Sequence, residues 1–503
     1  MTEIVNKCKM CSIINEVTKV RWRKQMKKRI ITGLMTFAVV LNIVACSVEK
    51  QGGNIESQDA NGENIITEDN SIDNNNTELV NAESVEYWLG KMENPDDVVM
   101  TLEQIKEYNA TMLEKLGNDW VSGYYDIKAF PEKVEGEWLK ERICYLDLRN
   151  TEMYLKGEAV TDSQWDEYYR SMNLESIPDE TDIAYGIIIH NTPVLDLPTE
   201  DIMTDDSMDE AANMLQQTNL KINEPVVVLW ESAHRDWLYV VANEYIGWIK
   251  KADCAYVKTR QEWISIQEQE EIIMVCEDDG VAEINEPLLM GTRLYLADAD
   301  EYQDLFTDEE SIDTENNYVI RFPQKDSEGL LKYQYIAISK ENKVSEGYVP
   351  YTRSNVLKLA FQELGLPYGW GGIDGKRDCS SYIKDIYACF GFMMPRNSRI
   401  QMSMPVMAKD TSTMSENDKE AYIANVQPGA IMGINGHVML YVGSANNQHY
   451  VISMLGSYIP ETVTEDFGSN IVNVNKVMVN TLDVKRRNGN TWLQELQAIV
   501  EVK

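Results

Sequence analysis

The spacing of apolar residues changes along the chain and predicts its organisation. Between residues 87 and 180 apolar side chains recur every three or four positions, which indicates helices with one buried face. From residue 181 to residue 350 short apolar runs alternate with polar turns, a pattern typical of strands. Residues 351–503 combine both patterns. We therefore expect a multidomain α+β protein with a helical N-terminal segment and a mixed C-terminal domain.

The strand-rich region falls into two sets, at residues 181–260 and 261–350. The clearest strands of the first set are expected at residues 225–233, 236–241 and 245–249. These runs resemble a bacterial SH3-like β-barrel, and we interpret the second set as another such barrel. Trp237, Tyr239 and Trp248 are expected in the barrel core, with stacking on a sugar as the alternative.

A cysteine at the start of a predicted helix is the first candidate for chemistry. Apolar residues recur at helical spacing after Cys379 until Gly391 interrupts them, and Asp378 is the expected N-cap. Backbone N–H groups at a helix start lower the pKa of a thiol and also stabilise an oxyanion. Because the Asp378 carboxylate opposes this effect, an ion pair with a histidine is the more important activator. His437 opens an alternating apolar strand and is the candidate base.

Three sequence blocks contain these residues, and they read Tyr368-Gly369-Trp370-Gly371-Gly372, Asp378-Cys379-Ser380-Ser381 and Gly436-His437-Val438-Met439-Leu440-Tyr441-Val442-Gly443. They resemble the NlpC/P60 family of papain-like cell-wall cysteine peptidases over residues 351–503. The resemblance implies that Cys379 is the nucleophile, His437 the base, and Tyr368 a neighbour of the oxyanion site. Substrate contacts are implied for Asp378, Ser380, Arg396 and Ser398. The implied reaction is cleavage of the bond between D-glutamate and the diamino acid in peptidoglycan stem peptides or muropeptides.

The residue that orients the histidine is left open between two positions. Counting from His437 without gaps favours His449, whereas the apolar run Tyr450-Val451-Ile452 should precede the orienting residue and favours Ser453. We prefer Ser453 because the residues just before His449 are typical of a turn. A serine brings no charge and is the weaker orienter. Asn397 stands where relatives that require a free N-terminal alanine carry an acid, so recognition of a peptide amine stays open.

The N-terminal region indicates export. A basic stretch at Met26-Lys27-Lys28-Arg29 precedes an apolar run, residues 30–44, that is short for a membrane span. With the small residues that follow, residues 26–46 resemble a lipoprotein signal, which implies acylation of Cys46. An uncleaved anchor helix is the alternative. We interpret residues 1–25 as an extension ahead of the true start.

Residues 47–86 are rich in Asn, Asp, Glu and Ser, and we interpret them as a disordered acidic tether. The formal net charge of the chain is −36, although residues 1–45 carry nine Lys and Arg against two Asp and Glu. Such an acidic protein is a poor partner for nucleic acid. We expect an extracytoplasmic monomer in the cell envelope, attached to the membrane through its lipid anchor.

The remaining cysteines and histidines predict little further chemistry. Beyond Cys46 the chain contains Cys144, Cys254, Cys276, Cys379 and Cys389. An odd number of scattered cysteines does not predict a disulfide framework, and Cys389 is expected in the core. His190 and His234 have no partners at metal-ligand spacing, and nucleotide-binding and metal motifs are absent from the sequence, so no cofactor or metal is predicted.

Two classes of function fit the sequence. The first is a lipid-anchored cysteine endopeptidase of peptidoglycan stem peptides, which Cys379 and His437 favour. The second is a wall-binding protein with an impaired catalytic domain, which the replaced third residue and Asn397 favour. A narrower alternative keeps the thiol chemistry but acts as an amidase or acyltransferase.

Overall fold

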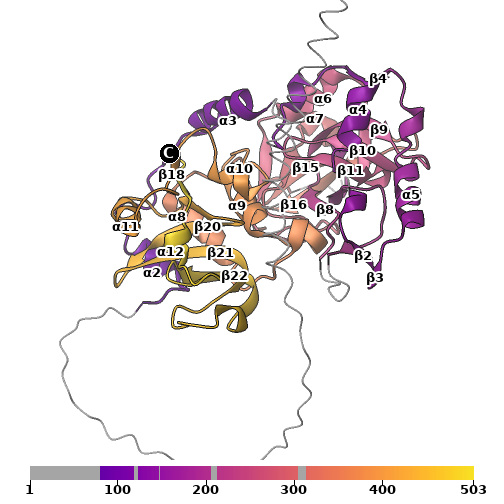
Figure 1. Ribbon diagram of the computed structural model, residues 1–503. Helices are drawn as coiled ribbons and strands as arrows, with labels where there is room; N and C mark the ends of the chain where they lie inside the picture. The colour runs from indigo at the N-terminus through magenta and orange to yellow at the C-terminus, as the bar shows by residue number, and fades with distance from the viewer. Residues whose placement is uncertain (1–79, 118–122, 147, 206–211, 304–312) are drawn as a thin grey trace, which may run out of the picture.

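The computed structural model describes residues 80–117, 123–146, 148–205, 212–303 and 313–503 (Figure 1). Three sheets of seven, five and six strands follow one another along these residues, with two small sheets beside them. The predicted leader with its lipidation site Cys46, and the predicted tether up to residue 79, lie outside the described residues. None of the helices in those ranges has the length and hydrophobicity needed to cross a membrane.

The N-terminal segment is mainly helical, as predicted, but it also contains short strands. Its helices are α2 (Val85–Leu89), α3 (Leu102–Leu116), α4 (Gly136–Ile143) and α5 (Asp162–Ser171). Its strands are β1 (Lys133–Glu135), β2 (Tyr154–Leu155), β3 (Glu158–Ala159) and β4 (Glu180–Asp182). A capping box formed by Thr101 and Gln104 satisfies backbone N–H groups at the start of α3.

The helices of the N-terminal segment pack against two different parts of the protein, the C-terminal domain and the first barrel. Trp88 in α2 packs against the ring of Tyr450 in the C-terminal domain, with 5.1 Å between ring centroids. Tyr239 of the first barrel donates a hydrogen bond of 3.1 Å to the backbone oxygen of Arg142 in α4. In Figure 1, α2 accordingly lies beside the C-terminal elements, whereas α4 and α5 lie beside the first barrel.

The seven-stranded sheet, which we call the first barrel, has the order β12-β5-β9-β10-β11-β6-β8. Its strands are β5 (Ala184–Ile188), β6 (Thr192–Leu195), β8 (Gln216–Leu220), β9 (Pro225–Glu231), β10 (Trp237–Val241), β11 (Ile246–Lys250) and β12 (Cys254–Val257). The short strand β7 (Met203–Thr204) joins β2 and β3 instead. Trp237, Tyr239 and Trp248 are buried, so the prediction that they belong to the core is confirmed.

The five-stranded sheet, which we call the second barrel, has the order β16-β15-β14-β13-β17. Its strands are β13 (Ile272–Val275), β14 (Arg293–Leu296), β15 (Asn317–Lys325), β16 (Leu331–Ser339) and β17 (Val344–Glu346). The helix α6 (Arg260–Gln267) precedes β13, and α7 (Ala299–Tyr302) follows β14. Ile273, Leu294 and Ile320 are completely buried and form part of its own apolar core.

The C-terminal domain is built on a sheet of order β18-β23-β19-β20-β21-β22. Its strands are β18 (Ala408–Asp410), β19 (Ile431–Ile434), β20 (His437–Ala445), β21 (Gln448–Tyr458), β22 (Val472–Thr481) and β23 (Ala498–Val500). Its helices are α8 (Arg353–Gln362), α9 (Cys379–Ala388), α10 (Ser398–Met402), α11 (Glu416–Ile423) and α12 (Trp492–Glu495). The helix α9 packs on β20 and β21, which brings the predicted cysteine and histidine elements together.

The first barrel touches the loop that precedes the cysteine helix. Strand β8 packs against the short 3₁₀ segment η6 (Trp370–Gly375), and Gln216 donates a hydrogen bond of 3.0 Å to the backbone oxygen of Gly371. Gly371 has a φ of +60°, and a Cβ there would lie 2.3 Å from the backbone oxygen of Gln216. Glycine is therefore needed at this position, both for its backbone angle and for the close approach of the barrel.

Candidate active site

Cys379 is the first residue of α9, and the helix begins where the sequence predicts. Asp378 is the N-cap, and its carboxylate accepts hydrogen bonds from the backbone N–H groups of Ser380 and Ser381. The Ser381 hydroxyl accepts a hydrogen bond of 2.8 Å from the backbone N–H of Asp378. This capping box fixes the direction of the first turn. Only 9% of Cys379 is exposed.

The candidate base His437 is the first residue of β20 and lies next to Ser453 of β21. The distance between His437 Nε2 and Ser453 Oγ is 3.0 Å, and Ser453 is completely buried. His449 lies near the other end of β20, where its Nδ1 is 2.7 Å from the hydroxyl of Ser444. Of the two candidates for the orienting residue, Ser453 is therefore the one in contact with His437.

The thiol lies at the strand end that carries the histidine. Helix α9, which begins with Cys379, packs on β20, and the backbone of Val438, the residue after His437, lowers the pKa of the Cys379 thiol. The ring of Trp492 packs against the imidazole, with 5.2 Å between centroids and 58° between planes. Sequence reasoning missed Trp492. The local signal at this position is the capping box at the start of α12, which does not indicate a contact with a histidine. Its contact with the imidazole restricts the ring orientations that His437 can adopt.

Burial moves the pKa values of the thiol and of the imidazole in the directions that favour their neutral forms. Burial, followed by the charge of Asp378, raises the pKa of Cys379 to about 12, although Val438 and Arg396 oppose this shift. Burial, followed by the charge of Arg486, lowers the pKa of His437 to about 3. The predicted lowering of the thiol pKa is therefore wrong for the free site. Loss of hydration outweighs the favourable backbone N–H groups at the helix start.

Asp378 and Arg396 form a buried, bidentate ion pair beside the cysteine. Arg396 Nη1 lies 3.0 Å from Asp378 Oδ1, and Nη2 lies 2.5 Å from Oδ2. Arg396 also donates 2.9 Å hydrogen bonds to the hydroxyls of Ser380 and of Thr218 in β8. Burial raises the pKa of Asp378, but Arg396 outweighs it and holds this pKa below its usual value. The first barrel therefore supplies Thr218 to the site, a residue that sequence reasoning missed.

The other residues implied in substrate binding lie around this pair. Tyr368 is half-buried, and burial together with the nearby groups of Asp378 and Cys379 raises its pKa well above the usual range. Ser398 is half-buried at the first position of α10. Gln401 donates hydrogen bonds to the backbone oxygens of Ser380 and Pro395, at 2.9 and 2.8 Å, and so connects α10 with the start of α9.

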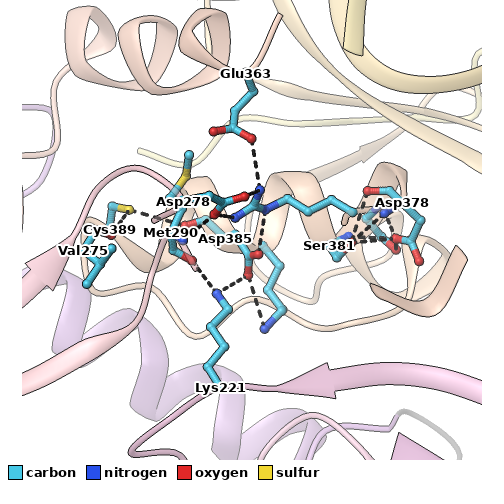
Figure 2. Close-up of polar contacts among 12 residues, drawn as sticks. Lys221, Val275, Asp278, Met290, Glu363, Asp378, Ser381, Asp385 and Cys389 are labelled. Atoms are coloured by element: carbon cyan, nitrogen blue, oxygen red, sulfur yellow. Dashed lines mark hydrogen bonds and ion pairs between the residues drawn. The ribbon is translucent and has the colours of Figure 1, made fainter. Parts of the chain in front are cut away.

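A buried ion network joins the start of α9 to both barrels (Figure 2). Arg377 contacts Asp278 of the second barrel at 2.6 Å, Asp385 of α9 at 2.8 Å and Glu363 at 3.0 Å. Lys221 of the first barrel contacts Asp385 at 2.5 Å. Burial raises the pKa of Glu363 to about 7. Burial also acts to raise the pKa of Asp385, but the surrounding cations outweigh it and hold this pKa below its usual value.

Comparison with known proteins agrees with this architecture. Residues 365–471 match the NlpC/P60 family, and residues 209–250 match the SH3 domain of the SH3b1 type. An NlpC/P60 endopeptidase from Photobacterium damselae subsp. piscicida is similar in structure, with a TM-score of 0.61 and 16% identity over 82% of this chain and 95% of that chain. This likeness shows a shared fold.

An NlpC/P60 family protein from Bacillus cereus ATCC 10987 also aligns, with a TM-score of 0.41 and 17% identity over 63% of this chain and 99% of that chain. The search of curated proteins finds no match. The fold is that of a multidomain protein with an SH3 domain ahead of its NlpC/P60 domain. This chain therefore carries a domain of the NlpC/P60 family at residues 365–471.

Proposed function

We propose that this protein is a lipid-anchored cysteine endopeptidase that hydrolyses peptidoglycan stem peptides at the bond between D-glutamate and the diamino acid. The packing of α9, which begins with Cys379, on β20, which begins with His437 held 3.0 Å from Ser453, carries the proposal. A thiol at a helix start and an oriented imidazole are the two groups that thiol hydrolysis requires.

In the proposed reaction His437 acts as a general base. Because Nε2 contacts Ser453, Nδ1 is the ring nitrogen that accepts the thiol proton. The sulfur then forms a bond to the D-glutamyl carbonyl carbon, and backbone N–H groups at the start of α9 stabilise the oxyanion. His437 returns the proton to the departing amine, which leaves a thioester. Water, deprotonated by His437, hydrolyses this thioester and releases the carboxylate.

The ion pair of Asp378 and Arg396 has a positioning role in this proposal. Both side chains are buried, and each hydrogen-bonds to other residues of the site. Together they fix the cap of α9 and the Ser380 hydroxyl relative to strand β8. Substrate groups then meet donors whose positions are already set, which reduces the reorganisation needed in the transition state.

The proposal is tested by incubating the purified chain with defined muropeptides and identifying the products by mass spectrometry. We expect one product that ends in a free D-glutamyl carboxylate and one that begins with a free diamino acid amine. Release of the sugar from an intact stem peptide would support an amidase instead. Transfer of the acyl group to an added amine would support an acyltransferase.

A wall-binding protein with an impaired catalytic domain is the second candidate. The pKa of Cys379, raised to about 12 by burial and by Asp378, favours it, since little thiolate exists in the free site. The two candidates differ in one measurable respect. Binding of the chain to purified cell walls, without any muropeptide product after long incubation, would support this second function.

Replacing Ser453 should lower the catalytic rate without changing substrate binding. We expect Ser453→Ala to reduce kcat roughly tenfold with little change in KM, because the lost contact orients His437 in the transition state. His449→Ala is the matched control and should be nearly silent, since His449 contacts Ser444 instead. Steady-state kinetics on a muropeptide measures both. A damaging His449→Ala beside a silent Ser453→Ala would contradict this assignment.

Replacing Cys46 should release the protein from the membrane. If Cys46 is acylated, wild-type protein will partition with membranes and Cys46→Ser will appear in the soluble fraction, because two acyl chains supply the anchoring energy. Cell fractionation followed by immunoblotting measures the distribution. Cys144→Ser, at a cysteine far from the signal, is the control and should stay with membranes. Membrane retention of Cys46→Ser would point to an uncleaved helix.

A further inference from the structure

Two cysteines from different domains meet behind the candidate active site. Cys276 directly follows β13 of the second barrel, and Cys389 is the C-cap of α9. Each thiol changes the pKa of the other, as expected of two sulfurs that lie close together. The Cys389 thiol also points at the second barrel, where its sulfur lies 3.8 Å from the backbone oxygen of Val275 (Figure 2).

We propose that Cys276 and Cys389 form a reversible disulfide that ties the second barrel to the helix carrying Cys379. The inference rests on the position of the Cys389 sulfur against Val275, the residue just before Cys276, and does not depend on the proposed peptidase activity. Cys254 provides a contrast within the same chain. It lies in the core of the first barrel among apolar side chains, and its sulfur contacts a backbone oxygen instead of a second thiol.

The two thiols differ in exposure and in acidity, and stepwise oxidation requires both differences. Cys276 is half-buried, whereas Cys389 is completely buried. The Cys389 thiol lowers the pKa of Cys276, and Cys276 together with burial raises the pKa of Cys389. An oxidant therefore reaches the more acidic thiol first, and the buried thiol stands beside it as the resolving group.

The oxidant is a disulfide, either a small molecule such as oxidised glutathione or a protein dithiol-disulfide. The Cys276 thiolate attacks one sulfur of this disulfide, forms a mixed disulfide and releases one thiolate. Cys389 loses its proton and attacks the Cys276 sulfur, which closes the internal disulfide and releases the second thiolate. Two protein thiols are thus oxidised by two electrons, and one external disulfide is reduced to two thiols.

The bond would close a long loop and connect two packed domains. Strands β14 to β17 and helix α8 lie between residues 276 and 389, so the crosslink removes much freedom from the unfolded chain. The Cys389 sulfur also lies 3.5 Å from the backbone oxygen of Asp385 in α9, and Asp385 belongs to the ion network of the same helix. Oxidation should therefore stabilise the interface without moving Cys379.

The test uses the full chain with Cys379→Ala, so that the candidate nucleophile does not react. The protein is treated with oxidised glutathione, remaining thiols are alkylated, and the digest is analysed by mass spectrometry with and without reducing agent. We expect a linked peptide pair that contains Cys276 and Cys389 and disappears on reduction. The melting temperature should rise on oxidation by an amount on the order of 5 °C.

Two further variants keep the test decisive. Cys276→Ser, at the half-buried position, should give no linked pair and no rise in melting temperature on oxidation. Cys144→Ser is the matched control and should still form the link. Recovery of both peptides unlinked, with glutathione attached to Cys276, would overturn the proposal. A link from Cys276 to any other cysteine would overturn it as well.

Discussion

Cys379→Ala should abolish hydrolysis of muropeptides while the protein stays folded. The variant loses the only group that forms the thioester in the proposed mechanism, so we expect turnover to fall roughly 10⁴-fold or more. The side chain is small and lies at the first position of α9, where Asp378 still caps the helix. Product formation followed by mass spectrometry measures the activity, and the far-UV circular dichroism spectrum checks the fold.

The matched control for this variant is Cys144→Ala, because Cys144 is a half-buried cysteine at the end of α4. It should retain wild-type turnover. Hydrolysis by Cys379→Ala above about one hundredth of the wild-type rate would contradict thiol catalysis, since the loss of a nucleophile costs far more than that. Such a result would leave the chain with its fold but with another catalytic group.

Local signals were sufficient for the elements that carry the candidate nucleophile and base. The N-cap at Asp378, the helical spacing after it and the alternation after His437 each depend on neighbours in the sequence. The hairpin after β20 is local as well. Its two turn residues, Asn446 and Asn447, have φ values of 50° and 61°, and this tight turn sets the register between β20 and β21.

The same register explains why the pattern argument favoured Ser453 over His449. Leu440 pairs with Ile452, so Ser453 lies on the strand face that His437 shares. His449 pairs with Ser444 near the turn, which places it far along β20 from the base. Placing the orienting residue by counting from His437 without gaps ignores the hairpin turn. The apolar run before Ser453 marks the part of β21 that pairs with β20, and so gives the correct position.

The sequence alone could not predict contacts between segments that lie far apart along the chain. Trp492 meets His437 only because α12 folds back onto the start of β20, and Thr218 reaches Arg396 only because the first barrel packs on the C-terminal domain. The raised pKa of Cys379 has the same origin, because burial depends on tertiary packing. The spacing of the cysteines along the sequence likewise did not indicate that two of them come close together across a domain boundary.

Removing Arg377 should destabilise the protein more than any change at the surface. Its side chain is 4% exposed, and it contacts carboxylates of Asp278, Glu363 and Asp385. Loss of one partner from a buried ionic cluster costs about 3 kcal/mol, because the remaining charges stay out of water without compensation. We therefore expect Arg377→Leu to lower the melting temperature by roughly 10 °C, measured by differential scanning calorimetry.

Most of the stability lost with Arg377 is expected to come from the uncompensated charge of Glu363. Asp385 keeps Lys221 and Lys384 as partners, at 2.5 and 3.6 Å, whereas Arg377 is the cation in contact with Glu363 among the described residues. Adding Glu363→Gln to Arg377→Leu removes the unpaired carboxylate and should recover part of the lost melting temperature. Recovery by this second change would show that uncompensated charge, and not lost packing volume, causes the destabilisation.

Lys133→Ala is the surface control, since Lys133 pairs with Glu180 at 2.9 Å while both side chains are more than half exposed, at 53% and 61%. Its melting temperature should stay within about 2 °C of wild type, because solvent screens exposed pairs. Arg377→Leu should also lower kcat at temperatures where it remains folded, since Arg377 precedes the cap of α9. A variant that melts like wild type and keeps full turnover would mean that the barrels do not hold the nucleophile helix through this network.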